Sequence, residues 1–107
     1  MIYEIEPVLS IEGKHVAIVG AGDAAFDYAL NLGKHNHVTI LDRGEQVKCL
    51  PLLWERANAC PHIAYRPNTA ISRLTATPEG GMTVECSSPS GTVILRADYV
   101  IGAIGRD

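Results

Sequence analysis

The sequence predicts an α/β fold, in which a parallel sheet has flanking helices and a three-stranded antiparallel β-meander replaces one crossover helix. In the first part of the chain, short continuous apolar runs are typical of parallel strands covered on both faces. Between two of these runs, apolar residues recur at the spacing of one helix face. In the second part, short alternating runs are separated by turn-forming residues, which indicates hairpins. Because the chain has 107 residues, we expect one domain over 1–107, with room for a core but small for an enzyme that holds a cofactor and a substrate together.

The first element expected is a buried strand at 16–19 that runs into a G-x-G-x-x-A turn and then a helix over roughly 23–32. In such a Rossmann-like unit, Gly20 permits the tight turn, Gly22 lets the backbone approach a pyrophosphate, and Ala25 keeps helix and strand close. The free N–H groups and the positive dipole end of the helix then face the phosphates. The predicted dinucleotide-binding residues here are Gly20, Ala21, Gly22, Asp23, Ala24 and Ala25.

An acidic residue follows the second predicted strand, at 38–41. Asp42 lies about 20 residues beyond Gly22, the spacing expected of an acid that hydrogen-bonds a ribose. The alternative is that Asp42 only caps the next turn. Asp23 is expected to face outward and to satisfy the helix dipole, because its charge would repel a pyrophosphate.

The helix between these strands has Ala25, Ala29 and Leu32 on one apolar stripe, and Gly33 supplies its C-terminal stop. A second helix is expected over 50–59, beginning near Pro51, and a third parallel strand over 63–65. Further predicted elements are meander strands at 71–77, 82–86 and 92–95 and a last parallel strand at 99–101.

The glycine-rich exit from the last strand lies at the carboxyl edge of the sheet, where ligands bind in such folds. Gly102, Ala103 and Ile104 are therefore further candidates for cofactor contacts, with a simple strand exit as the alternative. The aromatic side chains of Trp54 and Tyr65 could stack on an adenine, but aromatics with apolar neighbours more often lie in a core or an interface, so neither residue is assigned to the site.

The formal charge of −3, without a basic cluster, argues against nucleic acid or an anionic membrane surface as partner. The apolar runs are too short to span a bilayer and the N-terminus does not resemble a secretion signal, so we expect a cytoplasmic setting. Cys49, Cys60 and Cys86 lack C-x-x-C spacing and are expected to be buried or idle thiols. The four histidines show no ligand spacing, so no metal site is expected.

These motifs resemble the NAD(P)H-binding domain of thioredoxin reductase-like, FAD-dependent flavoproteins in the pyridine nucleotide-disulfide oxidoreductase family. The segments that carry the resemblance are 12–14, 16–19, 20–25, 26–32, 38–43 and 98–106. The resemblance implies a domain inserted into an FAD-binding domain of the same parent chain, which binds NAD(H) or NADP(H) and presents the nicotinamide to the flavin for hydride transfer. A homodimer is compatible with it, and residues 27–32 look most like the ferredoxin reductase branch.

The chain departs from that family in several places. It has no separate FAD fingerprint and no C-x-x-C, so neither flavin binding nor disulfide reduction is assigned to it, and no residue is predicted to be catalytic. Relatives that use NADPH usually carry a His-Arg-Arg-like triplet, where this chain has Asp42, Arg43 and Gly44. Asp42 would repel a 2′-phosphate, whereas Arg43 could turn toward one, and we favour NADH. Asp27 aligns with an acidic position near the nicotinamide, with an exposed helix carboxylate as the alternative.

The leading hypothesis is therefore a fragment of a larger flavoprotein that holds NADH for an FAD bound elsewhere; we take the stop just after a glycine-rich strand exit as a cut. One alternative is a free-standing nucleotide-binding Rossmann sensor without catalysis, against which the predicted meander argues. Another is a domain that keeps the fold but has lost binding, against which Gly20, Gly22 and Asp42 argue.

Overall fold

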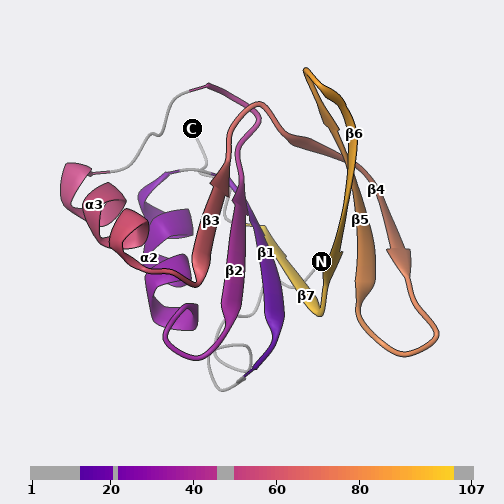
Figure 1. The fold of residues 1–107 in the computed structure, drawn as a ribbon, viewed down its shortest axis with the longest axis horizontal. Coiled ribbons are helices and arrows are strands. Elements are labelled where there is room, and N and C mark those ends of the chain that lie inside the picture. Colours follow the sequence, from indigo (N-terminus) through magenta and orange to yellow (C-terminus); the bar gives the residue numbers. More distant parts are fainter. Residues whose placement is uncertain (1–12, 21, 46–49, 103–107) are drawn as a thin grey trace.

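The computed structural model describes residues 13–20, 22–45 and 50–102, and it has the predicted architecture (Figure 1). The elements are β1 (His15–Val19), α2 (Asp23–Leu32), β2 (His37–Leu41), α3 (Pro51–Ala59), β3 (Ile63–Arg66), β4 (Ala70–Ala76), β5 (Met82–Ser88), β6 (Gly91–Ala97) and β7 (Tyr99–Gly102). The predicted fold class is confirmed, and each predicted element is present close to its expected position.

The central sheet has the strand order β3-β2-β1-β7, and all its described pairs are parallel. Val19, the last residue of β1, pairs with Leu41 of β2 and with Gly102 of β7. The carboxyl ends of these three strands therefore meet at one edge of the sheet. The strands β4, β5 and β6 form a separate antiparallel sheet between β3 and β7 in sequence, which is the predicted meander in place of a crossover helix.

The two faces of the central sheet are covered by different layers (Figure 1). On one face, alternate strand residues pack against α2 and α3; the buried residues of this cluster are Val16, Ile18, Ala25, Phe26, Ala29, Leu32, Val38, Ile40, Ala57 and Ile101. On the other face the strands pack against the meander, through Ala17, Leu41, Val84, Cys86, Ala97 and Val100. Burial of these apolar side chains on both faces is the main force that holds the three layers together.

The helix α2 lies against the sheet through the predicted stripe, because Ala25, Ala29 and Leu32 are at most 1% exposed. It ends at Gly33, as predicted, although Gly33 has ordinary right-handed helical dihedrals. A Cβ at Gly33 would lie 2.8 Å from the carbonyl oxygen of Ala29 and 2.9 Å from Cγ1 of Ile63. The glycine is therefore required by the close approach of the last turn of α2 and of β3, and not by a left-handed cap.

The meander has a buried inner face and an exposed outer face. Val84 and Cys86 of β5 are fully buried against the central sheet. Between them Glu85 pairs with Arg73 of β4 and Ile94 of β6, and Ile94 is 66% exposed. This alternation is the predicted pattern of a ribbon with one packed face and one solvated face.

The free thiols of the described residues are at Cys60, which is half-buried, and at Cys86, whose burial raises the pKa of the thiol. Cys49 lies outside the described residues.

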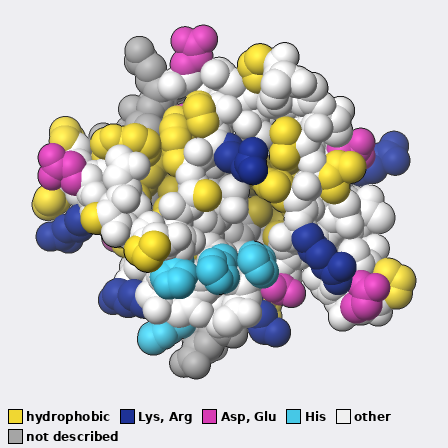
Figure 2. Space-filling model, in the orientation of Figure 1, with side chains coloured by type: hydrophobic (Ala, Val, Ile, Leu, Met, Phe, Trp, Pro, Cys, Tyr) yellow, Lys and Arg dark blue, Asp and Glu magenta, His cyan; other side chains and the backbone are white. Residues whose placement is uncertain are grey.

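Three imidazoles form a row along the amino-terminal edge of the central sheet (Figure 2): His15 stacks on His37 at 5.1 Å between ring centroids, and His37 meets His62 edge-on at 5.0 Å. Within residues 13–20, 22–45 and 50–102, no group of three or more His, Cys, Asp or Glu side chains could hold a metal ion. Neither α2 nor α3, the helices of the described part, could cross a membrane, because each is too short and too polar.

Candidate functional site

The turn between β1 and α2 depends on a glycine. Gly20 has a φ of 129°, a backbone conformation that side chains rarely allow, so a glycine is needed there. Its N–H donates to the carbonyl oxygen of Leu41, at 3.0 Å. This hydrogen bond fixes the turn beside the end of β2, so that the start of α2 and the residues after β2 lie at the same edge.

Gly22 is the N-cap residue of α2 and its backbone is extended, with φ −88° and ψ −172°. No described side chain caps this helix. The first N–H groups of a helix have no partner within it and carry the positive end of the helix dipole. Since Gly22 has no Cβ, an anion can approach these N–H groups closely, which makes this turn suited to a phosphate.

The neighbouring predicted residues divide between the core and the surface. Ala24 is exposed, whereas Ala25 is fully buried against the sheet, as its predicted packing role requires. Asp23 is exposed, and its Oδ1 accepts a hydrogen bond from the N–H of Leu50, the N-cap residue of α3, at 2.8 Å. The Asp23 carboxylate thus joins the starts of the two helices. Ala21 lies outside the described residues.

Asp42 follows β2 directly and is only 8% exposed. Its Oδ1 accepts a hydrogen bond from the N–H of Gly44 at 2.8 Å, and its Oδ2 accepts one from the hydroxyl of Tyr65 at 2.6 Å. The carboxylate therefore stabilises the turn after β2, which was the alternative interpretation of this residue. Each carboxylate oxygen can accept a further hydrogen bond, so the ribose contact stays a prediction.

The partner of Asp42 was not found by sequence reasoning. Tyr65 belongs to an aromatic cluster with Phe26 and Trp54, in which the ring centroids of Trp54 and Tyr65 are 5.1 Å apart. Both aromatics are partly buried and pack against the core on the helix side, and the Tyr65 hydroxyl in addition holds Asp42 in place. This contact follows from the register between β2 and β3: Leu41 pairs with Arg66, which places Tyr65 beside Asp42 on the helix side of the sheet.

The remaining candidates lie around the same edge. Arg43 is exposed in the loop after Asp42, and Gly102 ends β7 beside Val19. Ala103 and Ile104 lie outside the described residues. Asp27 is exposed on α2, in agreement with the simpler interpretation of that residue. The structure thus brings Gly20, Gly22, Asp42 and Gly102 to one sheet edge.

Replacing Tyr65 with phenylalanine is expected to lower the free energy of unfolding by about 1–3 kcal/mol, because a largely buried carboxylate oxygen loses a hydrogen bond. Urea denaturation of the two chains measures the difference. Tyr28→Phe is a matched control, since Tyr28 is a half-buried tyrosine on α2. An unchanged stability in Tyr65→Phe would mean that this hydrogen bond does not hold the turn.

Comparison with known proteins gives both sequence and structural relatives. No protein-family model matches the chain. An NADH dehydrogenase from Ferdinandcohnia aciditolerans is 35% identical over 65 residues, which cover 60% of this chain and 12% of that protein. A thioredoxin reductase from Treponema pallidum is 37% identical over 62 residues, covering 57% of this chain and 20% of that protein. The matched part of the chain thus spans a fifth or less of these relatives.

The fold is found in solved thioredoxin reductases. The structure of thioredoxin reductase from Giardia duodenalis superposes with a TM-score of 0.82 at 21% identity, covering 94% of this chain and 33% of that one. The enzyme from Streptococcus pyogenes gives a TM-score of 0.80 at 19% identity, covering 89% of this chain and 32% of that one. The chain therefore has the fold of about one third of a thioredoxin reductase.

Proposed function

Because this chain has the fold of thioredoxin reductases and is similar in sequence to a thioredoxin reductase and an NADH dehydrogenase, we propose that it binds a nicotinamide dinucleotide and presents it for hydride transfer to an FAD held by another domain of the same protein. The observation that carries this proposal is the Gly20 turn, which leads into a helix whose glycine N-cap leaves the first N–H groups open. The pyrophosphate would bind those N–H groups, and no basic side chain is needed there.

The cofactor's adenosine ribose would lie against Asp42, at the end of the strand next to β1. Its hydrogen bonds with Gly44 and Tyr65 hold the carboxylate in one orientation, which lowers the entropic cost of binding. The nicotinamide chemistry belongs to the cofactor, and this domain supplies position and electrostatics.

We further propose that NADH is preferred over NADPH. The buried Asp42 carboxylate would repel a 2′-phosphate, whose charge at neutral pH is close to two negative units. Arg43 is the one basic side chain directly after Asp42, and it is exposed to solvent. An exposed arginine is screened by water and salt and offsets only part of that repulsion.

The test is a calorimetric titration of the chain with NADH and separately with NADPH. We expect a binding free energy of about −8 to −4 kcal/mol for NADH, that is, a Kd between micromolar and millimolar. Asp42→Ala should weaken NADH binding about tenfold, because the ribose loses a hydrogen bond to a charged group. The same change should reduce the difference in affinity between NADH and NADPH. Tyr65→Phe is the control: it removes the hydrogen bond from the Tyr65 hydroxyl but keeps the carboxylate and its hydrogen bond with the N–H of Gly44.

The two variants separate a binding role of Asp42 from a structural one. If Tyr65→Phe weakens NADH binding as much as Asp42→Ala, the turn and not the carboxylate determines affinity. If NADPH binds at least as tightly as NADH, the proposed preference is wrong. Absence of binding by either cofactor would leave two alternatives: a pocket that the FAD-binding domain completes, or a domain kept for assembly.

A further inference from the structure

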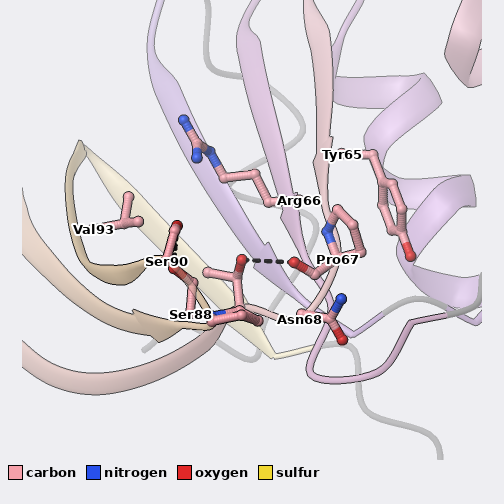
Figure 3. A pocket seen from close by; sticks show the side chains of 9 residues that line it. Tyr65, Arg66, Pro67, Asn68, Ser88, Ser90 and Val93 are labelled. Atoms are coloured by element: carbon pink, nitrogen blue, oxygen red, sulfur yellow. Dashed lines mark hydrogen bonds between the residues drawn. The ribbon is translucent and has the colours of Figure 1, made fainter.

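A second candidate site lies away from the Gly20 turn. A cavity of about 370 Å³ opens between the β3–β4 connection and the β5–β6 hairpin (Figure 3). Arg66, Asn68, Ser88, Ser90 and Val93 are among the residues that line it. Its volume lies within the range of about 300–1,000 Å³ that is usual for small-molecule sites.

The cavity exists because the meander covers only part of the central sheet. On the meander side, β6 contacts β1, at the middle of the sheet. Ala64 and Arg66 of the edge strand β3 are exposed. Consecutive strand residues point to opposite faces, and since Tyr65 packs with α2 and α3, both Ala64 and Arg66 point to the meander side. The part of that face near β3 is therefore open.

The cavity has the chemistry of an anion site. The Arg66 side chain extends from β3 toward the β5–β6 hairpin (Figure 3), and its charge partly offsets the rise in the pKa of the buried Cys86 thiol on β5. Within the described residues Arg66 makes no ion pair, whereas Arg96 is paired with Glu79. Among the described residues, no carboxylate lines the cavity. A guanidinium in this setting presents several N–H donors suited to a carboxylate or phosphate.

The other polar groups of the cavity are held in place by hydrogen bonds within the protein. The Ser88 hydroxyl lies 3.1 Å from that of Ser90 and donates to the carbonyl oxygen of Gly91 at 2.8 Å. Asn68 adopts a φ of 54°, and its N–H donates to the carbonyl oxygen of Gly44. Because Val93 and two prolines provide apolar walls, the ligand can have an apolar body as well as an anionic group.

We propose that this cavity binds a small molecule carrying a phosphate or carboxylate group, at a site separate from the Gly20 turn. The two sites are on different faces of the sheet, because Asp42 lies on the helix side with Tyr65 and Arg66 points to the meander side. They share one loop, since the N–H of Thr69 donates to the carbonyl oxygen of Asp42 at 2.8 Å.

The proposal is tested by titrating the ¹⁵N-labelled chain with inorganic phosphate and, in a second arm, with citrate, while amide shifts are followed by NMR. We expect saturable shifts at Asn68, Thr69, Ser88 and Ser90, and the arm with the lower Kd identifies the anion class. Arg66→Gln should weaken binding about tenfold or more, as loss of a charge-assisted contact implies. Arg73→Gln removes the same charge on the outer face of the meander, at a position paired with Glu85, and should leave the Kd unchanged.

Several outcomes would overturn the proposal. The first is a set of amide shifts confined to residues 22–25. The second is an equal weakening of anion binding by Arg66→Gln and Arg73→Gln. The third is a set of amide shifts that never saturates. Repeating the titration with saturating NADH separates the two sites: an unchanged Kd supports an independent site, whereas displacement of the anion by NADH would make the cavity part of the dinucleotide site. Phosphate binding is measured first without NADH. A failure to bind phosphate therefore leaves the proposed function untouched, and a failure to bind NADH leaves the proposed anion site untouched.

Discussion

Replacing Gly22 with valine is expected to abolish dinucleotide binding while the domain stays folded. The backbone of Gly22, at φ −88° and ψ −172°, is accessible to any residue, so a side chain there causes no dihedral strain. A branched Cβ would instead occupy the space through which the pyrophosphate approaches the N–H groups of α2. Loss of two such charge-assisted hydrogen bonds corresponds to about 3 kcal/mol, or at least a hundredfold in Kd, by calorimetry.

Gly22→Ser distinguishes a binding defect from a folding defect. Serine is a favoured N-cap residue, so it should keep or raise the stability of α2, yet its Cβ and hydroxyl occupy the same space. Gly20→Ala is the opposite case, because a φ of 129° strains any side chain and should lower the unfolding free energy. NADH binding by Gly22→Ser at the affinity of the unmodified chain would show that the cofactor does not approach the start of α2.

Elements with a strong local signal could be predicted from the sequence. The apolar runs of β1 and β2 indicated strands buried on both faces, and the alternation in β5 and β6 indicated a ribbon with one wet face. The sequence does not indicate which layer covers which face, because a strand that is apolar on both faces accepts either cover. Only the structure shows that α2 and α3 share one face and that the meander covers the other.

In the candidate site, the backbone turn could be predicted from the sequence, whereas the side-chain contacts and the cavity could not. The Gly20 turn was predictable, because the chain reversal itself needs a glycine. The hydrogen bond between Tyr65 and Asp42 joins residues 23 apart in sequence and depends on the register between β2 and β3. The cavity at Arg66 depends on how far the meander extends over the sheet, a long-range property without a local sequence signal.

Phe26→Ala is expected to cause the largest loss of stability. Phe26, on α2, is 0% exposed and packs in the cluster that α2 forms with α3 and the sheet, with its ring centroid 5.8 Å from that of Trp54 and 6.1 Å from that of Tyr65. Removing a buried phenylalanine ring costs about 3–5 kcal/mol, a large part of the roughly 5–15 kcal/mol that such domains have. Urea denaturation followed by the fluorescence of Trp54, the one tryptophan of the chain, measures the change.

Ile94→Ala is the matched control for this loss, because Ile94 is a large apolar residue of the outer meander face that is 66% exposed; it should change stability by less than about 0.5 kcal/mol. Since the Phe26 ring also packs against Tyr65, its loss should loosen the support of Asp42. The double variant with Tyr65→Phe should then be less destabilised than the sum of the single changes. Full additivity would mean that the aromatic cluster and the Asp42 turn are independent, so that the helix layer would not help to position the candidate site.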